Sequence, residues 1–157
     1  MMFVYTNAFN NFLNRRIMEV PISSFSWLDE YKIGDLIIDK QHEHLFELAN
    51  RIIDPYNDQQ TTYLNSMALH DYINTHFKAE ESLMEQCNYP DYKSHKEKHK
   101  LLTKKFDRLN SGILTDETTK EDVVKFMADW ILVHILHDDM HFQSFLNSTK
   151  TSLVELM

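Results

Sequence analysis

Five of the nine histidines in this 157-residue chain lie near carboxylates, in four separate clusters. The clusters are Asp39-Lys-Gln-His42, His76-Phe-Lys-Ala-Glu80, His95-Lys-Glu-Lys-His99 and His134-Ile-Leu-His-Asp-Asp139. In two of them, donors four residues apart would occupy one face of a helix. A helical bundle builds a metal site when each helix contributes one or two nitrogen or oxygen ligands to a shared interior. The spacing therefore predicts a buried metal centre.

The donors are more than one ion can use. Two carboxylates, Glu80 and one of Asp138 or Asp139, accompany the imidazoles. Two octahedral ions offer about twelve positions, and five imidazoles, two bridging carboxylates and a bridging solvent oxygen (oxo or hydroxo) fill all but one. Imidazole suits iron among other metals. We therefore predict two iron ions with one open position, and five nitrogen ligands: His42, His76, His95, His99 and His134.

The ligand types favour binding over catalysis. Di-iron oxidases of the ferritin type are richer in carboxylate and carry Glu-x-x-His on two helices, a motif that this chain lacks. Histidine-rich ligation should hold the reduced state and favour binding of oxygen over its activation. We expect Glu81 at the surface or beside a ligand, and the other histidines to be ordinary surface or core residues: His44, His70, His137 and His141.

Composition limits the classes of function. The formal net charge of −8 argues against a nucleic-acid partner, because phosphate binding needs a basic surface. The single cysteine, Cys87, excludes an internal disulfide and cysteine-based metal sites. One thiol fits a reducing compartment, and we expect a cytoplasmic protein. No stretch is long and apolar enough to span a membrane, and residues 1–20 lack the pattern of an export signal.

Only two glycines and three prolines interrupt the chain, which favours long helices. Apolar spacing predicts four, over residues 39–53, about 60–86, about 91–109 and about 119–147. Asp39 is the expected N-cap of the first, Leu64 and Leu101 are expected to face inward, and Asn88-Tyr-Pro90 should end the second. Short connections predict an all-α, up-down-up-down antiparallel four-helix bundle over residues 25–157. Residues 1–24 would form a loosely docked or dispensable N-terminal extension.

At these residues the chain resembles a known family, the hemerythrins, and specifically their single-domain bacterial members, over about residues 25–145. The lead-in Phe25-Ser-Trp27 and Tyr31-Lys-Ile-Gly34 precedes the first histidine of the set. The second, third and fourth helices carry His76 to Glu80, the pair His95 and His99, and Trp130 with His134 and Asp139. Each motif alone is weak, but four in the right order with no ligand missing make a strong signal.

The resemblance implies how the donors are shared. One iron takes His95, His99 and His134, while the other takes His42 and His76 and carries the vacancy. Glu80 and Asp139 would bridge the two ions, which makes the expected metal ligands His42, His76, Glu80, His95, His99, His134 and Asp139.

Helical geometry and the family resemblance disagree on which of two neighbouring aspartates is the metal ligand. Helical geometry alone pairs His134 with Asp138, four residues further on. The family pattern selects Asp139, five residues on. A bridging carboxylate approaches from the seam between the ions, and a local widening of the helix would also bring Asp139 to the site. We therefore expect Asp139 to be the bridging residue.

The resemblance also implies reversible dioxygen binding, in an apolar pocket lined by Leu45, Phe77, Trp130 and Ile135. Such a protein would carry, store or deliver oxygen, possess no enzymatic activity of its own and serve an oxygen-using enzyme. Two alternatives stay open. One is a sensor whose oxygen or redox state alters contact with a signalling partner, and the other is a slow di-iron oxidase or peroxidase.

Overall fold

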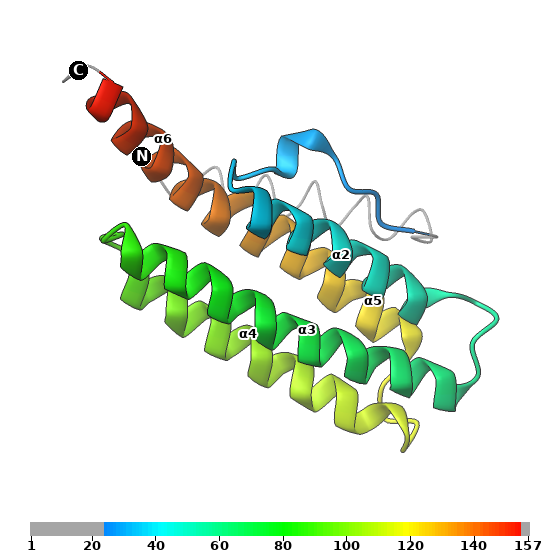
Figure 1. The fold of residues 1–157 in the computed structure, drawn as a ribbon. Helices are drawn as coiled ribbons and strands as arrows, with labels where there is room; N and C mark the ends of the chain where they lie inside the picture. The colour runs from blue at the N-terminus through cyan, green and yellow to red at the C-terminus, as the bar shows by residue number, and fades with distance from the viewer. Residues whose placement is uncertain (1–23, 155–157) are drawn as a thin grey trace, which may run out of the picture.

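Four long helical segments, joined by short connections, form the body of the computed structural model, which describes residues 24–154. They are α2 (Leu36–Ile53), α3 (Gln59–Gln86), α4 (Tyr92–Ile113) and a composite fourth segment. Figure 1 shows them side by side in alternating directions, with α2 against α3 and α3 against α4. The described residues contain no strand, so the predicted all-α antiparallel bundle is confirmed. The predicted extension over residues 1–24 lies, except for residue 24, outside the described part.

The helix ends follow from local hydrogen bonds. Asp35, not Asp39, caps α2, because its carboxylate accepts from the backbone N–H groups of Ile37 and Ile38. Asp39 lies in the first turn and binds backward instead, accepting from the N–H groups of Ile33 at 2.7 Å and Gly34 at 3.2 Å. The expectation for Asp39 was therefore wrong, because the helix begins one turn earlier than its apolar pattern. Helix α3 ends at Gln86, as the Asn-Tyr-Pro break predicts.

The fourth segment changes its winding in the middle. It consists of α5 (Lys120–Asp129), the π-helix η2 (Trp130–Asp139) and α6 (Met140–Val154), which follow one another without a break. A capping box of Thr119 and Asp122 starts it. A π-helix places hydrogen-bonded groups five residues apart, and such stretches are frequent at functional sites. This local widening brings residues five apart onto the same side of the segment.

Two apolar clusters occupy opposite ends of the bundle. The larger contains, among others, Leu45, Leu69, Phe77, Phe106, Phe126 and Trp130. The smaller contains Ile33, Ile38, Met84, Tyr89, Phe142 and Leu146. Along α3, Phe77 belongs to the first cluster and Met84 to the second, and Glu80 lies between them. The predicted donors therefore lie in a polar layer between the two apolar clusters.

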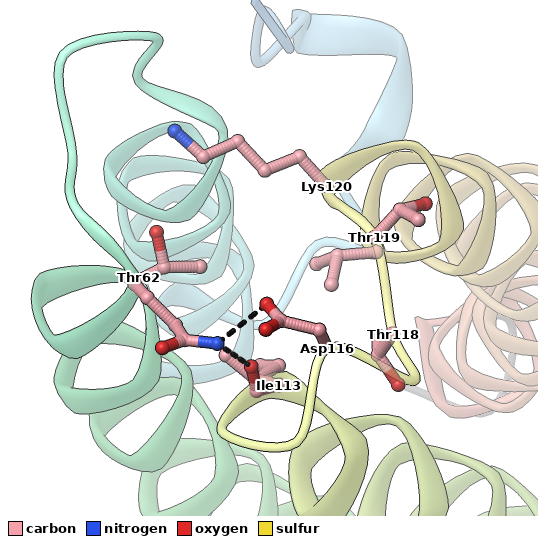
Figure 2. Close-up of a pocket in the computed structure, with 8 residues that line it drawn as sticks. Thr62, Ile113, Asp116, Thr118, Thr119 and Lys120 are labelled. Carbon is pink, nitrogen blue, oxygen red and sulfur yellow. Dashed lines mark hydrogen bonds between the residues drawn. The ribbon is translucent and has the colours of Figure 1, made fainter.

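Two apolar residues are placed differently from expectation. Leu64 on α3 and Leu101 on α4 are exposed, at 57% and 66%, although their spacing suggested an inward position. Leu101 has Lys98, Lys104 and Lys105 three or four residues away, so it lies on a charged face of α4. At the end of the bundle near residue 113, Gln59 donates to the carbonyl of Ile113 and to the carboxylate of Asp116, beside a cavity of about 260 Å³ (Figure 2).

An aromatic strap, residues 25–31, lies along α2. Its start is fixed by Asn50, whose amide oxygen accepts from the N–H of Phe25 at 2.7 Å and whose amide nitrogen donates to the carbonyl of Phe25 at 2.8 Å. Trp27 and Tyr31 then pack on Phe46 of α2. Among the described residues, no helix has the length and apolar character needed to cross a membrane.

Candidate metal centre

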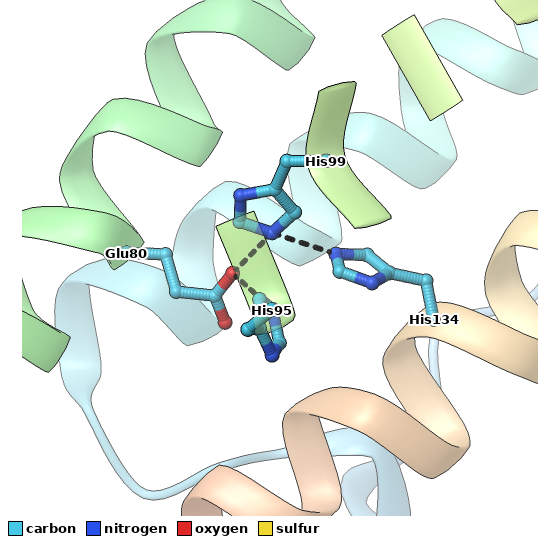
Figure 3. A group of neighbouring side chains, drawn as sticks. All are labelled: Glu80, His95, His99 and His134. Carbon is cyan, nitrogen blue, oxygen red and sulfur yellow. Dashed lines mark hydrogen bonds and ion pairs between the residues drawn. The ribbon is translucent and has the colours of Figure 1, made fainter. Parts of the chain in front are cut away.

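One group of four donors joins three helices in the polar layer. Nε2 of His99 lies 3.1 Å from Oε2 of Glu80 and 3.1 Å from Nε2 of His134. Nε2 of His95 lies 3.3 Å from the same oxygen of Glu80. Figure 3 shows the carboxylate and the three rings turned toward a common centre. One ligand atom from each of these residues falls within 4.8 Å of the others, a spacing that a single ion can bridge.

A second group shares two residues with the first. His76, Glu80, His134 and Asp139 each offer a ligand atom within 4.8 Å of the others. His42 is not part of this group, but its Nε2 lies 3.3 Å from Oδ2 of Asp139 and its ring centroid is 4.6 Å from that of His76. The two groups adjoin one another through Glu80 and His134. The structure thus brings all seven predicted donors together, with every side chain at most 3% exposed.

The two neighbouring aspartates take different positions. Oδ1 of Asp139 lies 3.5 Å from Nε2 of His134 and 3.3 Å from Nε2 of His95, and the residue is fully buried. Asp138 instead accepts from Lys98 at 2.7 Å and from His137 at 2.8 Å. The π-helix η2 explains this, because it aligns residues five apart, His134 and Asp139, where an α-helix would align residues four apart.

Many polar atoms of this layer lack a hydrogen-bond partner within the protein. A buried polar group without a partner costs free energy, so a native protein is expected to supply one. Seven of the unsatisfied atoms are carboxylate oxygens or Nε2 atoms that face the cluster: His42 Nε2, His76 Nε2, Glu80 Oε1 and Oε2, His95 Nε2, and Asp139 Oδ1 and Oδ2. These donors fit a bound metal, which would satisfy their lone pairs.

Protonation also suits metal binding. Burial lowers the pKa of His76 to about 3, so its ring is neutral at neutral pH. Burial opposes ionisation of Glu80, yet contacts with His95 and His99 hold the pKa of Glu80 well below its usual range. Burial also opposes protonation of His95, but contacts with the carboxylates of Asp139 and Glu80 raise its pKa to about 9. An incoming metal must displace that proton, since ligands bind in their deprotonated form.

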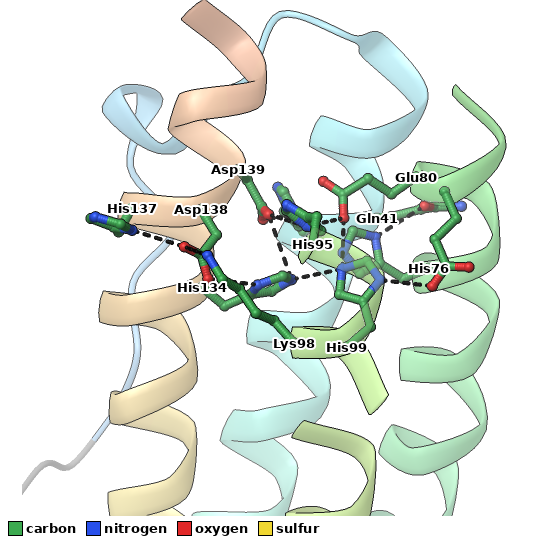
Figure 4. Close-up of polar contacts among 12 residues, drawn as sticks. Gln41, His76, Glu80, His95, Lys98, His99, His134, His137, Asp138 and Asp139 are labelled. Carbon is green, nitrogen blue, oxygen red and sulfur yellow. Dashed lines mark hydrogen bonds and ion pairs between the residues drawn. The ribbon is translucent and has the colours of Figure 1, made fainter. Parts of the chain in front are cut away.

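The outward-facing nitrogens of two histidines are held by residues that the sequence did not identify as partners. Nδ1 of His76 lies 3.2 Å from Oε1 of Gln41, and Nδ1 of His99 lies 3.0 Å from Oε1 of Glu81. Lys96 in turn donates to Glu81 at 2.8 Å. Figure 4 shows Gln41 beside His76. Glu81 was expected at the surface or beside a ligand, and it lies beside one. Gln41 gave no sequence signal beyond its place next to a predicted ligand.

The four predicted pocket residues are all buried, at 1–4% exposure. Leu45, Phe77 and Trp130 belong to the larger apolar cluster, while Ile135 packs against Phe46 under the strap. The ring of Phe77 stacks on that of His99, with centroids 3.8 Å apart and planes 6° from parallel. One side of the donor cluster is therefore bounded by apolar groups.

The histidines not chosen as ligands lie outside the two donor groups. His44 pairs with Glu47 at 2.8 Å, and His70 contacts Asp107 at 2.8 Å. His137 is 61% exposed and binds Asp138. The ring of His141 lies 4.7 Å from that of His137. All four are thus surface or partly buried residues.

Comparison with known proteins agrees with this site. Residues 34–146 match the family described as the hemerythrin HHE cation binding domain. This range covers more than half of the chain and contains every predicted donor. The protein therefore belongs to the hemerythrin family.

Individual relatives are distant but cover most of the chain. A hemerythrin-like protein of Naegleria gruberi is 30% identical over 124 residues, which is 79% of this chain and 95% of that protein. Bacteriohemerythrin of Pseudomonas aeruginosa is 25% identical over 131 residues, 82% of this chain and 86% of the relative. A crystal structure of a hemerythrin point mutant superposes with a TM-score of 0.71, at 26% identity over 78% of this chain and 97% of that one. Family and donor cluster together support iron binding.

Proposed function

We propose that this protein binds dioxygen reversibly at a pair of iron ions held inside the bundle. The observation that carries the proposal is the convergence of five buried histidines and two buried carboxylates, most of whose facing atoms lack a partner in the protein. The proposed ligands are His42, His76, Glu80, His95, His99, His134 and Asp139. When bound, the iron pair would supply the electrons that dioxygen takes up on binding and returns on release.

The negative charges of the donors suit two divalent ions but do not cancel their charge completely, so the loaded site keeps a small positive charge. Glu80 and Asp139 bring two negative charges into the layer, and the lowered pKa values of both carboxyl groups keep them ionised. Imidazole ligands are neutral when they bind metal. A small positive remainder favours an electron-rich diatomic ligand without a large electrostatic cost.

The apolar residues beside the cluster would protect a bound gas molecule. Leu45, Phe77 and Ile135 offer no proton, and they are almost fully buried. Protons promote irreversible loss of reduced oxygen, so an apolar wall favours its release as dioxygen. This wall and the histidine-rich donor set support a carrier or store of oxygen over an enzyme. A slow oxidase would give a different result in the experiment below, and a sensor would differ by a change in oligomeric state or partner binding between the oxygenated and oxygen-free forms.

The test is a gas-exchange cycle on iron-loaded protein. Reduced protein is exposed to air, its spectrum is recorded, and the gas is then removed under vacuum. A spectrum that returns to its starting form supports reversible binding, and about two iron ions per chain are expected. Steady consumption of oxygen with added ferrous iron would instead show an oxidase, and would overturn the proposal.

Two matched substitutions test the site itself. His76→Gln removes a buried donor, and iron content should fall. His44→Gln removes a partly exposed histidine that pairs only with Glu47 on its own helix and contacts Tyr72, and iron content should be unchanged. Equal iron content in the two variants would contradict the assignment.

A further inference from the structure

The two ends of the donor cluster differ in the charge of the residue that contacts the outward-facing Nδ1 atom of the histidine. Behind His99 is an anion, since Oε1 of Glu81 lies 3.0 Å from Nδ1. Behind His76 is a neutral amide, since Oε1 of Gln41 lies 3.2 Å from Nδ1. Glu81 lies on α3 and Gln41 on α2, and each contacts the Nδ1 atom of its histidine (Figure 4 shows Gln41 and His76).

The hydrogen on each ring can be placed from these contacts. An ionised carboxylate only accepts hydrogen bonds, so Nδ1 of His99 must donate to Glu81. Nε2 of His99 is then left with its lone pair, 3.1 Å from both Glu80 and His134. The same reasoning gives His76 an Nδ1–H that donates to the amide oxygen of Gln41. Each ring therefore presents Nε2 to the metal centre.

Glu81 is fixed in place from its other side. Lys96 donates to Oε2 of Glu81 at 2.8 Å and to the hydroxyl of Tyr92 at 2.9 Å. Glu81 is only 17% exposed, so solvent screens its charge little. A carboxylate that accepts from the outer nitrogen of a ligand histidine orients the ring and raises its basicity. An amide in the same position orients the ring but adds no charge.

We infer that Glu81 is a positioning residue that makes the ion beside His99 the easier of the two to oxidise, and that Gln41 leaves the ion beside His76 easier to keep reduced. The inference rests on the proposed iron pair and specifies how its two members differ. A more basic ligand stabilises the higher charge, so the ferric state is favoured where Glu81 acts. Asp138 adds to the same end of the cluster, since its Oδ2 lies 3.7 Å from Nδ1 of His134.

The asymmetry can be measured by removing or adding one charge. Glu81→Gln keeps the shape and one acceptor oxygen but removes the anion behind His99. Gln41→Glu places an anion behind His76. Glu85→Gln is the matched control, because it makes the same change on an exposed residue one turn further along α3.

The measurement is a redox titration of the iron-loaded full chain in the presence of an electron mediator. It gives two one-electron reduction potentials, one for each iron ion. Glu81→Gln should raise the lower potential, and Gln41→Glu should lower the higher one. Each substitution should change the ratio of ferric to ferrous iron at the ion that it adjoins about tenfold, which corresponds to a shift of about 59 mV in that ion's one-electron potential. Both variants therefore narrow the separation of the two potentials, whereas Glu85→Gln leaves it at the wild-type value.

The possible failures are distinguishable. Full iron content with potentials that match the Glu85→Gln control would overturn this inference and leave the proposed function intact. If Gln41→Glu widens the separation of the two potentials, this inference is also overturned, even if the Glu81→Gln variant loses its iron. A wild-type protein that holds no iron pair would overturn the proposed function and this inference together.

Discussion

Exchanging the two neighbouring aspartates for asparagine, one at a time, tests the role of the π-helix. In an α-helix of 3.6 residues per turn each residue advances by about 100°, so a residue five positions on lies about 140° away and one four positions on about 40° away. An α-helix would therefore point Asp138, not Asp139, toward the donors beside His134. In the structure Asp139 is fully buried among the donors, while Asp138 binds Lys98.

The expected effects differ in size. Asp139→Asn removes an anion whose oxygens lie 3.3 Å from Nε2 of both His42 and His95. Because this carboxylate would bridge both ions, iron should fall from about two per chain to less than about one. Asp138→Asn removes a partner of Lys98 and His137 and a distant neighbour of His134. Loss of such an outer contact weakens metal affinity by about 10–100-fold, so iron remains near two per chain at saturation.

The assay is iron content after reconstitution and gel filtration, followed by competition with a chelator to give relative affinities. Circular dichroism of each metal-free variant establishes that the bundle is folded. The reasoning is refuted if Asp139→Asn retains wild-type iron with wild-type affinity, or if Asp138→Asn is the variant that loses it. Either result would mean that η2 does not set which aspartate binds.

Three further predictions concern stability. In metal-free protein, the lowered pKa of His76 (about 3, against about 6.5 unfolded) gives stability that is lost as pH falls below 6.5, by about 1.4 kcal/mol per pH unit. The raised pKa of His95 (about 9) gives stability that is present below 6.5 and is lost as pH rises to 9, so urea unfolding should show a maximum near pH 6.5. Phe106→Ala should cost about 3–5 kcal/mol in urea unfolding because Phe106 is fully buried, with iron content unchanged. Asp35→Ala should cost about 1 kcal/mol in the same assay, because two N–H groups lose their cap.

Each of these has an outcome that would contradict it. A flat profile of stability between pH 5 and 9 would show that the two histidines do not titrate as described. Wild-type stability of Phe106→Ala would mean that the larger cluster relaxes to fill the space. An Asp35→Ala variant as stable as the wild type, beside a destabilised Asp39→Ala, would restore Asp39 as the cap of α2.

The bundle could be predicted from sequence because its signals are local. Apolar periodicity and breakers such as Asn88 located all four helices, although the fourth continues to Val154, about seven residues beyond its predicted end. Sequence reasoning failed at residues whose contacts do not follow the apolar spacing of their helix. Asp39 accepts hydrogen bonds from the loop before its helix, and Leu64 and Leu101 are apolar residues that face solvent.

The donor cluster was predictable in composition but not in detail. Residue types and order identified seven candidates, and the structure brings them together. Their outer contacts join different helices, as Gln41 does with His76, and no spacing along one helix reveals such a pair. The position of Asp139 depends on a change in helical winding that an assumed period of 3.6 residues hides.

The aromatic strap offers a way to observe opening of this centre apart from unfolding. Trp27 lies beside His42, with ring centroids 5.9 Å apart, and the strap is attached at its start by hydrogen bonds between the Phe25 backbone and the Asn50 side chain of α2. The amide hydrogen of Phe25 is thus a natural reporter, because its exchange with solvent deuterium requires the strap to lift but leaves the bundle intact. Exchange at Phe25 faster than in the core helices would show that the strap lifts from α2 while the bundle stays folded.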